Sequence, residues 1–179
     1  ADGSVVAIGA RNSDIYGSQS GLVRLYRNFN NKWEKIGDDI NGEAAFDELG
    51  FSVSLSADGS VVAIGARKGH VRIYQNNNGT WEKIGDDIDG EDFRLGWSVS
   101  LSADGSIVAI GDEDSSLVRI YQNVNENWEQ IGEDIYGEAI INGDSIYLDV
   151  GRYKYNDGNE RSGWSVSLSA DGSIVAIGD

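Results

Sequence analysis

The chain has 179 residues, including 24 glycines but no proline, cysteine or methionine, and its formal net charge at pH 7 is −16. The lack of cysteine excludes disulfides and thiolate metal sites. The acidic charge repels nucleic-acid phosphates and so argues against nucleic-acid binding. No apolar run approaches the roughly 18 residues of a membrane-spanning helix, so no membrane span is predicted.

One repeated phrase dominates the sequence. Copies of Ala-Asp-Gly-Ser-(Val/Ile)-Val-Ala-Ile-Gly begin at Ala1, Ala57, Ala103 and Ala170. An aromatic-Ser-Val-Ser-Leu-Ser segment precedes the last three copies and begins at Phe51, Trp97 and Trp164. The copies are unequally spaced, which indicates structural units that share a core and differ in their loop insertions.

Each unit is predicted to contain four antiparallel strands, best seen in the second copy. Residues 51–56 alternate apolar and polar side chains, as expected of a strand with one buried face. Asp58 and Gly59 predict a two-residue hairpin turn in which both residues have positive φ. The next strand, 61–65, is apolar on both faces, and two further strands follow at 71–74 and 81–85.

A four-stranded antiparallel unit of about 45 residues is typical of a β-propeller blade. The predicted fold class is therefore all-β, a β-propeller or part of one, with about three and a quarter blades in view. The expected blades are 1–50 (first strand missing), 51–96, 97–163 with an insertion at 139–161, and 164–179 as the first two strands of another. Because the chain opens and stops within the repeated phrase, we expect a segment of a longer polypeptide.

The repeat resembles known propeller families. Residues 98–111 resemble the first two strands of a WD-repeat blade, and the chain outside the insertion is more similar to FG-GAP repeats, the type found in integrin α-subunits. It is closer still to SADGS-VAIGA … VR-Y … W-IGDDI-GE arrays of secreted or surface proteins of marine microbes and algae. This resemblance implies a secreted or cell-surface location, and FG-GAP repeats bind Ca²⁺ through acidic loops.

An acidic segment follows the fourth strand of every complete unit. In the second unit its carboxylates are Asp86, Asp87, Asp89, Glu91 and Asp92. Hard cations such as Ca²⁺ take several carboxylate oxygens, and acidic residues beside a glycine turn can supply them. We therefore predict these residues as candidate Ca²⁺ ligands. The alternative is a solvated turn that connects one blade to the next.

Tryptophan opens the fourth strand of each complete unit, at Trp33, Trp81 and Trp128. Because large rings that recur at one repeat position bury apolar area, we expect them to pack between blades. A sugar-stacking platform is the alternative. In the loop before Trp81, Asn78 begins an Asn-Gly-Thr sequon, which predicts N-glycosylation if the protein enters a eukaryotic secretory pathway.

The insertion departs from the repeat and is predicted to carry specific contacts, because insertions project from one face of a repeat array. Tyrosine and arginine are enriched at interface hot spots. The candidate interaction residues are Tyr147, Arg152, Tyr153, Lys154 and Tyr155. An extra hairpin decorating the blade is the alternative.

The sequence as a whole predicts a non-catalytic extracellular propeller module with a structural or adhesive role, such as part of a surface filament or sheath. The expected partners are other protein chains, with self-association through strand edges and glycan binding as further options. One alternative is a Ca²⁺-dependent receptor for glycans or proteins, and another is a glycosidase-type enzyme that uses paired carboxylates. Because His70 is the only histidine and no acidic pair stands out, no catalytic residue and no enzyme are predicted.

Overall fold

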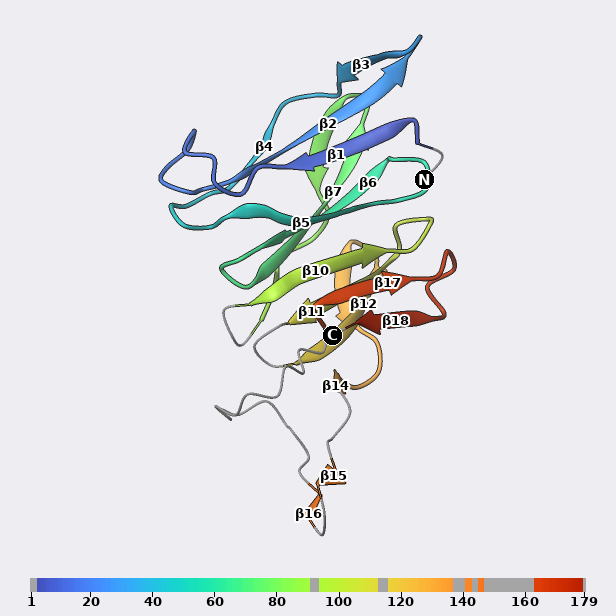
Figure 1. The fold of residues 1–179 in the computed structure, drawn as a ribbon. Coiled ribbons are helices and arrows are strands. Elements are labelled where there is room, and N and C mark those ends of the chain that lie inside the picture. The colour runs from blue at the N-terminus through green and yellow to red at the C-terminus, as the bar shows by residue number, and fades with distance from the viewer. Residues whose placement is uncertain are drawn as a thin grey trace.

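The computed structural model is all-β, with every strand pairing antiparallel (Figure 1), which confirms the all-β part of the predicted fold class. The residues that the structure describes are 3–90, 94–112, 116–136, 141–142, 145–146 and 163–178. Within these ranges there is no helix, and hence none that could cross a membrane.

The strands form three larger sheets and two hairpins. The first sheet contains β1 (Val5–Gly9), β2 (Leu22–Phe29), β3 (Lys32–Lys35) and β4 (Ile40–Asn41). The second sheet contains β5 (Leu49–Leu55), β6 (Val61–Ala66), β7 (His70–Asn77), β8 (Thr80–Lys83) and β9 (Ile88–Asp89). The third sheet contains β10 (Leu95–Leu101), β11 (Ile107–Asp112), β12 (Leu117–Val124), β13 (Asn127–Gln130) and β14 (Ile135–Tyr136). The hairpins are β15 (Ile141–Asn142) with β16 (Ser145–Ile146), and β17 (Ser165–Leu168) with β18 (Val175–Gly178).

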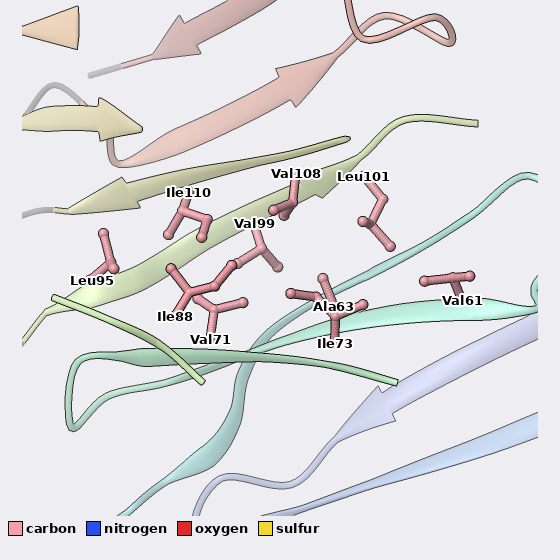
Figure 2. Packing of buried hydrophobic residues seen from close by; sticks show 10 residues of the cluster. All are labelled: Val61, Ala63, Val71, Ile73, Ile88, Leu95, Val99, Leu101, Val108 and Ile110. Carbon is pink, nitrogen blue, oxygen red and sulfur yellow. The ribbon is translucent and has the colours of Figure 1, made fainter. Parts of the chain in front are cut away.

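The sheets are stacked in chain order, and β5, β10 and β17 follow one another along one side of the stack (Figure 1). We call these three the inner strands. All six residues of β6 are buried, because its sheet is covered on both faces. Figure 2 shows one core layer, in which Val71 and Ile73 of the second sheet meet Val99 and Ile110 of the third. The described sheets do not close into a ring.

The Asp-Gly turns differ from the prediction. Only Gly59 has positive φ, at 70°, whereas the two-residue turn requires it of Asp58 as well. The loop is longer: the Gly59 amide donates to the Ser56 carbonyl at 3.1 Å, and the Ser60 amide donates to the Asp58 carboxylate at 2.9 Å. The aspartate therefore shapes the loop through its side chain, as in an Asx turn.

The acidic segments contain a short strand that the sequence analysis did not predict. Ile40 of β4 and Ile88 of β9 lie opposite the start of the third strand in their sheets, at Val23 and Val71. Both isoleucines are buried, with 6% and 5% of their surface exposed. The buried isoleucine fixes the segment to its sheet. The acidic residues on either side of it are therefore held in place and do not form a solvated turn that is free to move.

The inner strands of successive sheets are joined through serine side chains. The Ser52 hydroxyl donates to the Gly96 carbonyl at 2.7 Å, and the Ser54 hydroxyl accepts from the Leu101 amide at 3.0 Å. Ser98 and Ser100 repeat these contacts toward the last hairpin. The polar face of each alternating strand therefore contacts the next sheet instead of solvent.

Candidate functional site

A hollow of ≈ 250 Å³ opens between the second and third sheets. The residues lining it come from the acidic segment after β8 and from the strands β12 and β13. They are Asp86, Asp87, Ile88, Asp89, Tyr121, Asn127 and Trp128. Three carboxylates on one side thus face an amide and two aromatic rings on the other.

The aromatic side of the hollow is held by contacts between the sheets. The indole Nε1 of Trp128 donates to the Ile84 carbonyl at 3.0 Å, which fixes the orientation of the ring. Tyr121 packs against the same apolar cluster as Trp128, and burial raises the pKa of its phenol. Both rings therefore present fixed apolar surface and remain in their neutral forms near pH 7.

Asp87 is the ion-paired carboxylate of the hollow. Its Oδ1 lies 2.7 Å from Lys83 Nζ and its Oδ2 lies 2.7 Å from Arg72 Nε. Burial alone raises the pKa of Asp87, but the hydrogen bonds from Lys83 and Arg72 outweigh it and the net pKa is lowered. Asp87 is therefore ionised at neutral pH. By contrast, Asp86 and Asp89 are exposed.

Behind the hollow, Arg72 connects the first two sheets. Besides Asp87, its guanidinium contacts Glu43 at 3.1 Å and Asp47 at 3.4 Å. Its side chain is only 5% exposed. Burial lowers the pKa of Arg72, but the hydrogen bond and charge of Asp87 raise it further, so the guanidinium stays charged. Glu43 ends the acidic segment of the first unit, and Asp47 lies in the link between β4 and β5.

His70 lies beside this network and is buried, with 7% of its surface exposed. Its Nε2 is 3.5 Å from Asp47 Oδ1 and has no hydrogen-bond partner among the described residues. Burial lowers the pKa of His70 more than Asp47 raises it, so the imidazole is neutral at pH 7. No local sequence pattern predicts this contact, because Asp47 and His70 belong to different units of the repeat.

The predicted Ca²⁺ ligands are only partly within view. Asp86, Asp87 and Asp89 all line the hollow, whereas Glu91 and Asp92 lie outside the described residues. In the part of the chain that is described, no three acidic or histidine side chains gather as metal ligands. Both carboxylate oxygens of Asp87 already form ion pairs, one with Arg72 and the other with Lys83. The Ca²⁺ site stays a prediction.

The other predicted sites have different outcomes. Asn78 is exposed in the turn between β7 and β8, where its side-chain amide donates to Asn77 Oδ1 at 3.2 Å. This position suits a glycan acceptor, and glycosylation stays a prediction. The predicted interaction residues all lie outside the described residues, namely Tyr147, Arg152, Tyr153, Lys154 and Tyr155.

The beginnings of the inner strands carry a row of aromatic rings. The ring centroid of Trp97 is 4.5 Å from that of Phe51 and 5.1 Å from that of Trp164. Arginine side chains lie over this row, Arg11 at 4.8 Å from the Phe51 centroid and Arg94 at 5.8 Å from the Trp97 centroid. Cation–π contacts of this kind stabilise the row. The repeat position of the rings was visible in the sequence, but their mutual contact was not.

No protein-family model and no curated protein matches the chain. Among solved structures it is similar to a Bacteroides fragilis protein provisionally named a 6-phosphogluconolactonase, with 19% identity and a TM-score of 0.51. The match covers 72% of this chain and 38% of that protein, so the chain spans well under half of its length. At this identity the likeness concerns the fold.

This match corrects the predicted function. The predictions of a non-catalytic structural or adhesive module and of no enzyme are contradicted by this match, in which the same fold occurs in a protein named as an enzyme. The secreted or cell-surface location stays a prediction. Both contradicted predictions relied on the absence of a recognisable catalytic set in the sequence. Sites on repeated scaffolds are assembled from residues of different units, so a sequence pattern does not exclude them. The resemblance to FG-GAP repeats stays a prediction.

Proposed function

We propose that the stacked sheets are blades of a β-propeller. Support comes from the common strand order of the second and third sheets and from the neighbouring inner strands. Phe51, Trp97 and Trp164 occupy one repeat position, and the ring of Trp97 contacts both of the others. Such contacts are expected where the innermost strands of consecutive blades surround a common axis.

We propose further that this propeller hydrolyses a small sugar-derived lactone or ester. The observation that carries the proposal is the fold likeness to the protein named a 6-phosphogluconolactonase. The hollow between the second and third sheets is the proposed active site, because it combines carboxylates with aromatic surface. Sugar-like rings stack on aromatic faces, and a carboxylate can act as a general base toward water.

The charge of the hollow favours an uncharged substrate. Asp86, Asp87 and Asp89 line it, and the chain carries a net charge of −16. Carboxylates at short range repel a phosphate group, and the net charge of the protein opposes its approach. We therefore assign a neutral lactone or sugar ester to this chain, rather than the phosphorylated lactone in the name of its structural relative.

Asp89 is the proposed general base. Asp89 is exposed and lines the hollow. The equivalent residue is Asn41 in the first sheet and Tyr136 in the third, so the second sheet alone among these three has a carboxylate at this position. In the proposed step a water oxygen attacks the acyl carbon while its proton passes to Asp89. The ring C–O bond then breaks, and the proton moves from Asp89 to the departing alkoxide. Trp128 and Tyr121 position the substrate.

The test is steady-state hydrolysis of glucono-δ-lactone and neutral sugar esters by the wild-type protein and by Asp89→Asn. We expect kcat to fall by about 100-fold or more in the variant, which is the usual size of a general-base contribution. The fold should persist, because asparagine already stands at this position in the first sheet. Asp38→Asn, which removes an exposed carboxylate outside the hollow, is the matched control and should leave kcat unchanged.

Two results contradict the proposal. One is the absence of hydrolysis of every neutral lactone and ester by the wild-type protein. The other is a rate that survives Asp89→Asn unchanged, which removes the base from the mechanism. Preference for a phosphorylated lactone would refute the charge argument by itself.

A further inference from the structure

We infer that the row of aromatic rings at the beginnings of the inner strands is a binding site for a small carboxylate that is joined to a ring. The row consists of Phe51, Trp97 and Trp164, with Arg11 and Arg94 lying over it. None of these five residues lines the hollow of the proposed hydrolase. The inference therefore goes beyond that function and does not depend on it.

The first observation is that a β-bulge accompanies the rings. The register of β5 against β6 shifts between Leu49 and Ser52, and β10 shifts against β11 at the equivalent place. The residue before the ring is a glycine in both strands, with φ of 85° at Gly50 and 95° at Gly96. A bulge re-aims a side chain, and bulges are frequent beside active sites. The rings are therefore released from the alternation of their strands and meet one another.

The second observation is that the rings keep accessible surface. Trp97 has a ring of the row on each side, at 4.5 and 5.1 Å between centroids, yet it is only half-buried. By contrast, Val99 and Leu101 of the same strand are buried, with 8% and 7% of their surface exposed. Rings that served only the core would be covered as completely as these aliphatic side chains. The row therefore has apolar surface left for a ligand.

The third observation is the positive charge at the row. Arg11 is exposed, and its guanidinium carbon lies 4.8 Å from the Phe51 centroid. A cation–π contact does not require the N–H donors of a guanidinium, so those of Arg11 are available to an incoming acceptor. Arg94 adds a second cation, and the nearby carboxylate of Glu48 is already paired with Arg67 at 3.0 Å. The row is thus a positive site in a chain whose net charge is −16.

These features define the chemistry of the ligand. A guanidinium presents a fork of donors that matches the two oxygens of a carboxylate. The Phe51 and Trp97 centroids are only 4.5 Å apart, so a ring attached to that carboxylate can rest on the neighbouring aromatic surface. The net charge of the chain opposes a phosphate more than a singly charged carboxylate. Sugar acids and aromatic acids share this chemistry.

The test is an NMR titration of the wild-type protein that follows the indole N–H signals. One arm uses galacturonate, whose carboxylate is joined to a sugar ring, and the other uses benzoate, with an aromatic ring. Galactose and benzyl alcohol are their neutral counterparts. We expect an acid, but not its neutral counterpart, to shift the Trp97 signal saturably, and the arm that responds identifies the ring. Trp33, which is 50% exposed but outside the row, is the control and should not respond.

Variants test the charge directly. Arg11→Gln should weaken binding of the acid by about 10-fold or more, because the carboxylate loses a charged donor. Arg24→Gln is the matched control, since it removes the same charge from an arginine that pairs with Asp39, and it should leave the affinity unchanged. Neither variant should alter lactone hydrolysis, whereas Asp89→Asn should keep the affinity for the acid. Binding is measured without turnover, so the two proposals can fail separately.

Three results overturn the inference. The first is that neither acid shifts the Trp97 signal, or that the acids bind no more tightly than their neutral counterparts. The second is an equal loss of affinity in Arg11→Gln and Arg24→Gln, which would show only a general effect of charge. The third is tighter binding of galactose 1-phosphate than of either acid, which would contradict the choice of a carboxylate.

Discussion

Arg72 shows how one side chain can connect two repeats. Its guanidinium meets Asp87 of its own sheet and Asp47 and Glu43 from the segment after the first sheet. Arg24 has the same repeat position but pairs with Asp39 near the surface. The difference arises because the second sheet is covered by a neighbour that supplies extra carboxylates. A buried ion pair costs most when one partner is removed, since the other charge stays buried.

Arg72→Ala should therefore lower the free energy of unfolding by about 3–5 kcal/mol, because Asp47 is left as a buried charge without its cation. Urea denaturation followed by tryptophan fluorescence measures this loss. Arg24→Ala is the matched control, and its effect should be much smaller because water replaces the lost partner. Equal losses in the two variants would contradict a buried network at Arg72.

The repeated Asp-Gly loops should make stability fall in acid. Hydrogen bonds from Ser169 and Ser173 lower the pKa of Asp171 to about 2, and equivalent bonds lower the pKa of Asp58 and Asp104. Because the folded-state pKa lies below the unfolded value, this stabilisation is present above about pH 4 and is lost as the pH falls toward 2.

NMR titration of the Asp171 carboxyl measures this directly, and we expect a midpoint at about pH 2. In Asp171→Asn the melting temperature should depend less on pH between about 4 and 2. A midpoint at the ordinary aspartate value would show that the serine hydrogen bonds do not form.

At the scale of elements, the spacing between sheets depends on glycine at the end of each second strand. A Cβ at Gly65 would lie 2.1 Å from the Gly96 carbonyl oxygen and 2.3 Å from Ser52 Oγ. The Ser52 hydroxyl donates to that same carbonyl. The inner strand of one sheet therefore approaches the second strand of the preceding sheet more closely than any side chain allows.

Gly65→Ala should destabilise the chain by about 1–3 kcal/mol, because a backbone carbonyl must move to admit the methyl group. Gly178→Ala alters the same repeat position, but there the methyl meets only the Ser165 side chain among the described residues, and its Oγ, at 2.5 Å, can rotate away. Chemical denaturation of both variants should show the larger loss at Gly65. A neutral Gly65→Ala would mean that the sheets are further apart than described.

The regular strands were predictable because their patterns are local. Alternation in 51–56 and the apolar run 61–65 correspond to β5 and β6, although β5 begins earlier, at Leu49, and its register shifts before Ser52. The short strands β4 and β9 were not predicted, because a single buried isoleucine in each leaves no periodic signal. The hollow was missed because Asp89 and Trp128 belong to different units, and no pattern within one unit relates them.

At the scale of the whole molecule, successive sheets in the stack contact one another through the same kind of interface. Each contact between complete sheets combines an indole hydrogen bond, apolar side chains and a glycine of close approach. Repeats that contact only their neighbours gain stability from each added interface. If the sheets are propeller blades, the inner strands must curve around one axis, and the face of the first sheet that carries Ile8 and Trp33 must be covered.

The structure of the complete natural polypeptide, determined by crystallography or electron cryo-microscopy, tests this claim most directly. We predict that β5, β10, β17 and their equivalents surround a common axis in a closed ring. Trp33 should then donate its indole N–H to an Ile-Gly carbonyl of the final sheet. A straight, open stack of sheets, with Trp33 facing solvent, would contradict the propeller.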